Sequence, residues 1–143
     1  MQMSISVRLY LEADRFALQQ LMTELGYSLN DDEMVDHIRE IRAKDGEVFV
    51  AEVAGSVVGC ICAIIDVRLA AGKYGELVSL TVTRNYQGSG IGTILVRHGE
   101  SWLRTRVNKI RVRANTIRNK AHGFYEALDY KPIKSQKIFI KEL

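Results

Sequence analysis

A glycine-rich segment, residues 87–92 (Gln-Gly-Ser-Gly-Ile-Gly), has the clearest chemical capacity in this sequence. An apolar run, Leu77 to Val82, precedes it, and a helix-like run, Ile91 to Arg106, follows it. The glycines therefore lie on a predicted strand-to-helix turn. The first N–H groups of a helix lack backbone partners and carry the positive end of the helix dipole, so such a turn can bind a phosphate or pyrophosphate. The alternative is a connection that only turns the chain, and the glycines alone favour neither interpretation.

Two common phosphate-binding motifs do not fit this segment. The Walker motif ends in Gly-Lys followed by Ser or Thr, whereas Gly92 is followed directly by Thr93. The Rossmann motif has the spacing G-x-G-x-x-G and an acidic residue about twenty positions later. Here the spacing is G-x-G-x-G, and Asn108 and Lys109 occupy the later region. The sequence therefore excludes both of these nucleotide-binding motifs.

Length and composition indicate one folded domain. The chain has 143 residues, of which 47% are hydrophobic and 26% charged, which is typical of globular proteins with a sizeable core. The formal net charge of +3 is too small to predict a nucleic-acid partner. No apolar run approaches the roughly 18 residues of a membrane span, and residues 1–10 lack the apolar core of a signal peptide. We therefore expect a cytoplasmic protein with no membrane or nucleic-acid partner.

Hydrophobic periodicity predicts the elements that position the glycine-rich segment. The first half of the chain is predicted to contain a strand with Ile5, Val7 and Leu9; a helix capped by Asp14 and ended by Gly26, with Phe16, Ala17, Leu21 and Leu25 on its apolar side; a helix that begins at Asn30 or Asp31 and ends before Gly46; and a hairpin of Val48–Val53 and Val57–Val67 around Ala54-Gly55-Ser56. The second hairpin strand is apolar on both faces, which suits the centre of a sheet.

The second half is predicted to contain a loop, Arg68–Gly75; a strand, Glu76–Thr83; the glycine-rich segment with its helix; a strand, Lys109–Ala114; a short helix, Ala121–Leu128; and a final strand pair, Tyr130–Ile133 with Lys137–Ile140. A strand, a helix and another strand in this order imply a right-handed parallel crossover. We therefore expect a mixed α/β fold, a single domain over residues 1–143, with the order β-α-α-β-β-β-α-β-α-β-β.

Three features together resemble the GNAT N-acetyltransferase superfamily, whose fold has this order. Q-x-x-G-x-G between a strand and a helix is similar to the acetyl-CoA pyrophosphate loop of the family, and Gly-Glu-Leu at residues 75–77 begins the preceding strand. Arg118-x-x-Ala-His-x-Phe-Tyr125, followed by Glu-Ala-Leu-Asp-Tyr, resembles its second signature. Arg118 stands where Asn is commoner, as in the branch of aminoalkylphosphonate and aminoglycoside N-acetyltransferases. Asp129 stands where Gly is commoner, which leaves the local turn geometry open.

The resemblance implies an N-acetyltransferase that passes the acetyl group of acetyl-CoA directly to the primary amine of a small molecule in a ternary complex. An alkylammonium has a pKa near 10.4, so a base is useful at neutral pH. By resemblance this base is Glu76, and Tyr125 is the acid that protonates the leaving thiolate. A solvated strand-end carboxylate and a core aromatic residue are the respective alternatives.

The coenzyme contacts implied by the resemblance include backbone groups of the strand before the loop, with an N–H near Leu80 as the oxyanion donor. The implied coenzyme-binding residues are Leu80, Thr81, Val82, Gln87, Gly88, Ser89, Gly90, Ile91, Gly92, Thr93, Asn115 and Asn119. Gln87 is expected to hold the loop. For the two asparagines, a role as turn and cap residues is equally open.

The remaining polar clusters suggest no second site. Cys60 and Cys62 lie in one apolar run, and the three histidines show no accompanying spacing, so we expect buried, reduced thiols and no metal. Lys109, Arg111 and Arg113 alternate with apolar residues and no aromatic residues interleave with them, which favours a solvated face over a nucleic-acid-binding patch. The family resemblance also implies a homodimer. A protein lysine or N-terminal acetyltransferase and a non-catalytic acyl-CoA-binding sensor are the alternative functions.

Overall fold

The computed structural model describes residues 4–143. The chain divides into two compact units, Met1–Val112 and Arg113–Leu143. The first unit contains a mixed sheet with its covering helices, and the second contains one helix and the C-terminal segment.

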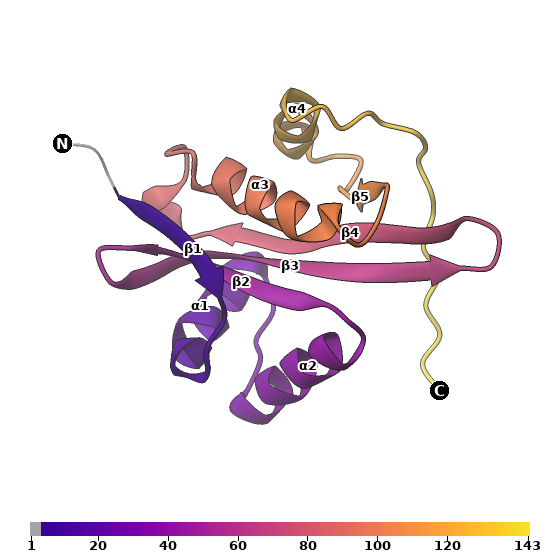
Figure 1. Ribbon diagram of the computed structural model, residues 1–143. Coiled ribbons are helices and arrows are strands. Elements are labelled where there is room, and N and C mark those ends of the chain that lie inside the picture. The colour runs from indigo at the N-terminus through magenta and orange to yellow at the C-terminus, as the bar shows by residue number, and fades with distance from the viewer. Residues whose placement is uncertain (1–3) are drawn as a thin grey trace. The chain divides into compact units, whose positions relative to one another are not determined.

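The sheet of the first unit has its five strands in sequence order: β1 (Ile5–Leu9), β2 (Glu47–Val53), β3 (Ser56–Arg68), β4 (Gly72–Val82) and β5 (Ile110–Val112). β1 to β4 pair in antiparallel fashion, and β5 pairs parallel to β4. β3 is the central strand and has 13 residues (Figure 1). The predicted hairpin, its central second strand and the parallel crossover are thereby confirmed. Ala54 and Gly55 make the hairpin turn with φ angles of 50° and 81°, the left-handed conformations that a tight two-residue turn requires.

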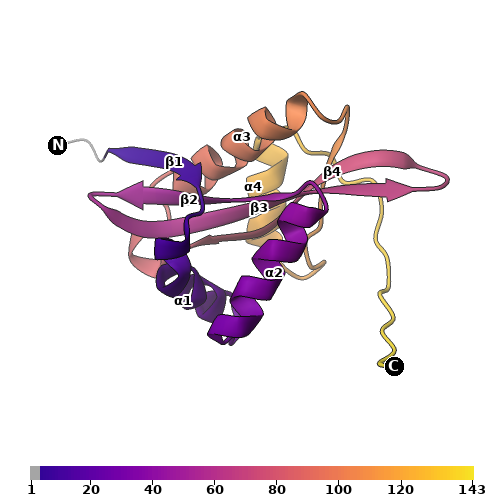
Figure 2. The same cartoon turned by 60° about the horizontal axis from the view of Figure 1, so that its bottom comes forward.

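Three helices of the first unit cover the two faces of this sheet. α1 (Arg15–Leu25) and α2 (Asp31–Ala43) lie against one face and α3 (Ile91–Arg104) against the other (Figures 1 and 2). Gly26 ends α1 with φ 112° and donates its N–H to Met22 O at 3.0 Å. Asn30 caps α2, because its side chain accepts the Glu33 N–H at 2.9 Å while the Glu33 carboxylate accepts the Asn30 N–H at 3.1 Å. These predicted helix boundaries are confirmed.

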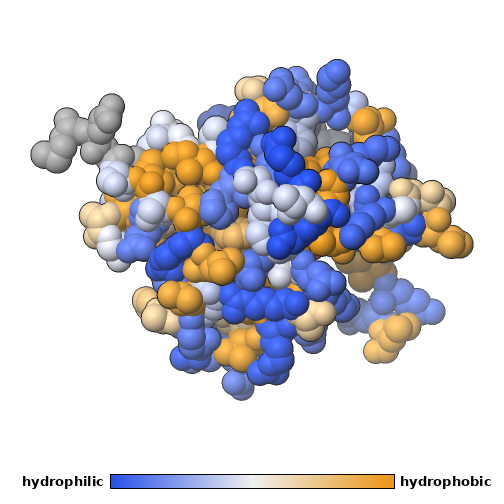
Figure 3. All heavy atoms as spheres, in the orientation of Figure 1, coloured by the Kyte–Doolittle hydropathy of each residue, from blue (hydrophilic) through white to orange (hydrophobic). Residues whose placement is uncertain are grey.

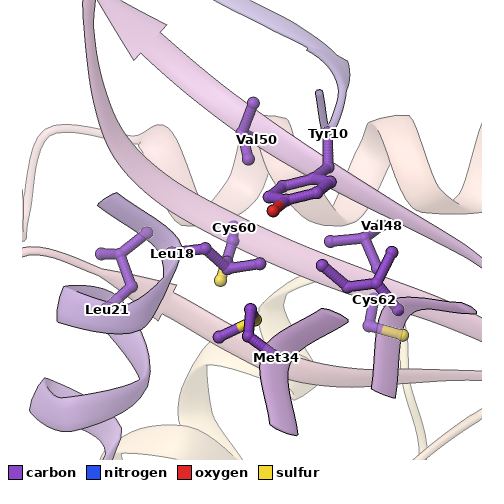
Figure 4. Close-up of a cluster of buried hydrophobic side chains, with 9 residues drawn as sticks. Tyr10, Leu18, Leu21, Met34, Val48, Val50, Cys60 and Cys62 are labelled. Carbon is purple, nitrogen blue, oxygen red and sulfur yellow. The ribbon is translucent and has the colours of Figure 1, made fainter. Parts of the chain in front are cut away.

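Both faces of the sheet bury apolar side chains. The cluster between the sheet and the helices α1 and α2 consists of Tyr10, Leu18, Leu21, Met34, Ile38, Val48, Val50, Cys60 and Cys62 (Figure 4). On the other face α3 lies very close to β4. A Cβ on Gly99 would come within 2.6 Å of the Leu77 side chain, and one on Gly75 within 2.9 Å of Leu103. These two glycines therefore allow the close approach of α3.

The second unit has α4 (Asn119–Ala127) as its helix. Asp129 follows it with φ 70°, and the Tyr130 N–H bonds Tyr125 O at 3.0 Å. Asp129 thus adopts the left-handed conformation in which glycine is commoner. Aspartate tolerates this region better than most residues, so the local turn forms without the glycine.

The predicted final strand pair is not found. Within residues 4–143, no strand pairing includes Tyr130–Ile133 or Lys137–Ile140. The β-branched residues there suit a strand, but a strand forms only where a neighbour supplies the backbone partners. Pro132 also lacks an N–H to donate. β5 is likewise shorter than the predicted Lys109–Ala114, because its pairing with β4 spans only Ile110–Val112.

Three further predictions near the helices and turns were wrong. The Asp14 carboxylate does not cap α1; it accepts bonds from Arg8 Nη1 at 2.7 Å and from the Leu11 N–H at 2.8 Å. Because the Arg8 guanidinium is charged, its bond to Asp14 is stronger than a bond to a helix N–H would be.

The predicted loop Arg68–Gly75 is mostly strand. β3 extends as far as Arg68, and β4 begins already at Gly72. Phe16, predicted on the apolar side of α1, is 71% exposed, whereas the predicted Leu21 is buried together with Leu18. Isolated exposed apolar residues are common, and Figure 3 shows hydrophobic residues interspersed with hydrophilic ones.

Candidate functional site

The glycine-rich segment joins the end of β4 to the beginning of α3. After Val82 the chain makes a short 3₁₀ turn, η2 (Arg84–Tyr86), and Gly88 and Gly90 then take φ angles of 79° and 89°. Gly90 is the N-cap of α3, and the first intrahelical bond runs from the Ile94 N–H to Gly90 O at 3.1 Å. The N–H groups of residues 91–93 therefore have no carbonyl one turn earlier in the helix. A Cβ on Gly88 or Gly90 would meet no heavy atom within 4 Å, so the backbone here is open to a ligand.

Side chains of the segment itself and of α1 hold it in place. Gln87 Nε2 donates to Val82 O at 2.9 Å, which ties the segment to the end of β4, and Ser89 Oγ donates to Tyr86 O. The Glu24 carboxylate of α1 accepts bonds from Thr83 Oγ1 at 2.8 Å and from the Arg84 N–H at 3.1 Å. Sequence reasoning missed Glu24, because no local pattern links it to a turn 59 residues away.

A β-bulge interrupts β4 at Ser79 and Leu80, where the predicted coenzyme-binding residues of this strand begin. Cys60 opposes Thr81 and Cys62 opposes Val78, so that Ser79 and Leu80 both face the single residue between the two cysteines. Ser79 has φ 56°, and Cys60 Sγ donates to its carbonyl oxygen at 3.4 Å. A bulge turns backbone groups away from the regular ladder. Sequence reasoning missed it, because a non-glycine residue with positive φ gives no sequence signal.

The parallel strand β5 pairs with only a short part of β4 and does not accompany its C-terminal half. The paired residues run from Gly75 with Ile110 to Leu77 with Val112. The last five residues of β4, Val78–Val82, lie beyond this pairing. The predicted coenzyme-binding positions Leu80, Thr81 and Val82 are therefore on the part of β4 that β5 does not accompany.

Glu76 is buried within β4, with 9% of its side chain exposed. The interpretation of Glu76 as a solvated strand-end carboxylate is therefore wrong. Its Oε1 accepts a bond from Nε of Arg111 at 2.6 Å, and Arg111 is its register partner on β5. The prediction of a solvated face is therefore wrong for Arg111, because its side chain is only 21% exposed and forms ion pairs.

Asp66 on β3 completes this charged group. Its Oδ2 accepts bonds from Arg111 Nη2 at 2.6 Å and from Arg68 Nε at 2.9 Å. Arg111, and then Arg68, hold the pKa of Asp66 below its ordinary value, because both stabilise the charged carboxylate. Asp66 and, more weakly, Glu76 raise the pKa of Arg111. The Tyr74 ring centre lies 5.2 Å from the guanidinium carbon of Arg111.

The other predicted site residues belong to the second unit. Tyr125 lies in α4, half-buried, with ring-centre distances of 5.1 Å to Phe124 and 5.8 Å to Tyr130. Burial raises the pKa of its phenol, so Tyr125 carries its proton at neutral pH. Asn115 makes a local turn, because its Oδ1 accepts the N–H two residues later at 3.1 Å. Asn119 is the first residue of α4.

The thiols and histidines form no additional centre among residues 4–143. No group of three metal-ligating side chains occurs there. Cys60 and Cys62 are unpaired and buried, and burial raises the pKa of each thiol to about 12. The thiolate is the reactive form, so both cysteines are expected to be inert. No helix in the same residue range is long and apolar enough to span a bilayer.

Comparison with protein families gives a match over most of the chain. The model of the acetyltransferase (GNAT) family matches residues 14–130. No curated protein matches the sequence.

Solved structures with the same fold include three N-acetyltransferases. An aminoglycoside N-acetyltransferase in complex with CoA is 15% identical with a TM-score of 0.86, and the match covers 100% of this chain and 98% of that one. An aminoglycoside 6'-N-acetyltransferase from Acinetobacter haemolyticus is 18% identical with a TM-score of 0.75, covering 96% and 99%. Glucosamine-6-phosphate N-acetyltransferase from Arabidopsis thaliana is 20% identical with a TM-score of 0.79, covering 96% and 99%.

Proposed function

Because the chain belongs to the acetyltransferase (GNAT) family, and is thus an N-acetyltransferase that uses acetyl-CoA, we propose that its acceptor is the primary amine of a small molecule. The observation that carries the coenzyme part of the proposal is the open glycine-rich segment at the N-terminus of α3, held by Gln87 and Glu24. Two solved relatives of the fold are named for small amines, an aminoglycoside and glucosamine 6-phosphate, which supports a small-molecule acceptor.

In this proposal the glycine-rich segment binds the pyrophosphate of acetyl-CoA. The N–H groups of Gly88, Gly90, Ile91, Gly92 and Thr93 donate to phosphate oxygens, and the dipole of α3 adds a favourable potential. Ser89 and Gln87 keep the turn in place through their bonds to Tyr86 and Val82. The lack of contacts around a Cβ on Gly88 or Gly90 supports this role.

The pantetheine arm of the coenzyme is proposed to lie along the part of β4 that β5 does not accompany. Backbone groups of Leu80, Thr81 and Val82 bond the arm there, and the N–H near Leu80 polarises the acetyl carbonyl as it becomes tetrahedral. The bulge at Ser79 and Leu80 supports this assignment, because it redirects the backbone where these residues begin. Asn115 and Asn119 are proposed as further coenzyme contacts from the second unit.

The chemistry proposed is direct attack in a ternary complex. The amine nitrogen bonds to the thioester carbonyl carbon, the C–S bond breaks, and Glu76 takes the proton that the nitrogen loses. Tyr125 gives its phenolic proton to the departing thiolate, and the products are the N-acetyl amine and CoA. The Tyr125 phenol carries its proton at neutral pH, as a proton donor must. The burial of Cys60 and Cys62 favours direct transfer over an acyl-cysteine intermediate.

We further propose that residues 1–143 act as one GNAT domain, since the family match extends over both units. A cytoplasmic location and a homodimer complete the proposal and rest on the sequence and on the family resemblance alone.

The proposal is tested by following thiol release from acetyl-CoA with a panel of amines. Aminoalkylphosphonates, aminoglycosides, polyamines and amino acids represent small acceptors, and lysine peptides represent proteins. We expect release with one small-molecule class. Release with lysine peptides alone would assign a protein acetyltransferase. If no amine of the panel causes thiol release while acetyl-CoA still raises the melting temperature of the protein, the remaining function is a non-catalytic acyl-CoA sensor.

A further inference from the structure

One arginine links three strands of the sheet through two carboxylates. Arg111 of β5 donates through Nε to Glu76 of β4 and through Nη2 to Asp66 of β3, both at 2.6 Å. Asp66 is the register partner of Tyr74, two residues before Glu76 on β4. The two carboxylates are therefore diagonal neighbours on the same face of the sheet, a separation of about 7–8 Å between Cα atoms. The guanidinium fills the space between them.

The guanidinium is itself held from several sides. Its Nη2 is fixed by Asp66, which Arg68 also holds at 2.9 Å. The Tyr74 ring centre lies 5.2 Å from its central carbon, within the range of a cation–π contact. Because guanidinium is planar and rigid, fixing one of its nitrogens fixes the direction of the others. The position of Asp66 on β3 thus determines where Arg111 Nε meets the Glu76 carboxylate.

Glu76 needs such support if it is to take a proton from the acceptor amine. The strand fixes its Cα, but three side-chain torsions separate the Cα from the carboxylate oxygens. A catalytic base must be held to within about half an ångström to be efficient, and a misplacement of about 1 Å can reduce a rate roughly 100-fold. A bond to one carboxylate oxygen at 2.6 Å provides that constraint.

We propose that Arg111 is a positioning residue for Glu76 and that Asp66 is its anchor. The inference rests on the proposed function, because it takes Glu76 as the base of acetyl transfer. Arg111 acts through Glu76 and contacts neither substrate in this account. Its loss should therefore lower kcat, leave the KM for acetyl-CoA nearly unchanged, and have little effect once Glu76 has been removed.

The main test is a double-mutant cycle of Arg111→Lys and Glu76→Gln, assayed with the most active amine. Lysine keeps the charge but cannot bond two separated carboxylates as a planar fork does. Arg111→Lys is expected to lower kcat about 10- to 100-fold, with the KM for acetyl-CoA within about twofold of the parent value. In the Glu76→Gln background the same change should lower kcat by less than about twofold.

Lys109→Gln provides the matched control. Lys109 lies two residues before Arg111, contacts the same Tyr74 ring at 5.8 Å, and takes part in none of the ion pairs found among residues 4–143. Its replacement should leave kcat unchanged. Asp66→Asn provides a second test of the same inference, because it removes the ion pair between Arg111 and residue 66 while Arg111 and Glu76 both remain. It should lower kcat in the same direction as Arg111→Lys, and it replaces that variant if Arg111→Lys does not fold.

Three results would overturn the inference: full additivity of the two changes in the cycle, an equal loss of kcat in Lys109→Gln, or an unchanged kcat in both Arg111→Lys and Asp66→Asn. Failure of the proposed function looks different. In that case Glu76→Gln itself keeps the parent kcat, or no amine is acetylated by the parent protein.

Discussion

Replacing Gly90 by alanine should separate the fold from coenzyme binding. Gly90 has φ 89°, in the left-handed region where a side chain costs roughly 1–2 kcal/mol. A Cβ there would meet no heavy atom within 4 Å, so no clash adds to this strain. We expect the free energy of unfolding to fall by about 1–2 kcal/mol, and the melting temperature by roughly 2–8 °C for a chain of this length.

The expected loss of acetyl-CoA affinity is larger than this strain explains. The new methyl group would project into the space that we assign to the pyrophosphate. If it removes one charge-assisted bond from the N–H groups of residues 91–93, the loss is about 1.5–3 kcal/mol. The Kd for acetyl-CoA should then rise roughly 10- to 150-fold.

Gly72→Ala is the matched control for this experiment. Gly72 has φ 78°, a Cβ there would also meet no heavy atom within 4 Å, and the residue begins β4, whereas the glycine-rich segment follows the other end of that strand. Thermal denaturation should show a similar loss of stability in both variants. Calorimetric titration with acetyl-CoA should show weaker binding for Gly90→Ala alone. Equal and undiminished affinities would refute the assignment of this segment to the pyrophosphate.

Three other substitutions test the site and the core. Glu76→Gln should lower kcat about 10²- to 10⁴-fold and flatten the pH profile of kcat/KM on its acidic side; an unchanged profile in steady-state assays would remove Glu76 as the base. Asp14→Asn should reduce the free energy of unfolding by about 2 kcal/mol at pH 7. Arg8 lowers the pKa of Asp14 in the folded protein, so the ionised carboxylate stabilises the fold at pH 7. The difference in unfolding free energy between parent and variant should disappear as the pH falls below about 4, the ordinary pKa of aspartate, and then below the pKa of Asp14 in the folded protein. Urea unfolding at pH 7 and pH 3 can check this. Tyr10→Phe removes a buried hydroxyl that has no partner among the described residues, so thermal denaturation should show unchanged stability or a gain of about 1 kcal/mol, and a clear loss would mean that the hydroxyl is bonded.

Features with local causes were predictable from the sequence. The caps of α2 and the glycine after α1 depend on residues within a few positions of each helix end. The Ala54-Gly55 turn and the strand-to-helix turn at Gly88 and Gly90 follow from the conformations that short turns and glycine allow. The candidate coenzyme loop could therefore be located before its surroundings were known.

Features that depend on distant partners were not predictable from the sequence. Glu24 reaches the turn at Thr83 from another helix, and Arg111 meets Asp66 from a strand 45 residues away. The bulge at Ser79 depends on the register between β3 and β4, which side-chain alternation alone does not determine. Likewise, the β-branched residues of Lys137–Ile140 predicted a strand, although strand formation also needs a paired neighbour.

The central claim is that the chain moves an acetyl group from acetyl-CoA to a small amine, and mass spectrometry of a single reaction tests it most directly. Purified protein is incubated with acetyl-CoA and each small amine in turn, and free CoA and acetylated amine are quantified together. The account predicts equal amounts of the two products with one class of amine, and a much smaller yield of both with Glu76→Gln. Release of CoA without acetylated amine, or no consumption of acetyl-CoA with any small amine, would contradict it.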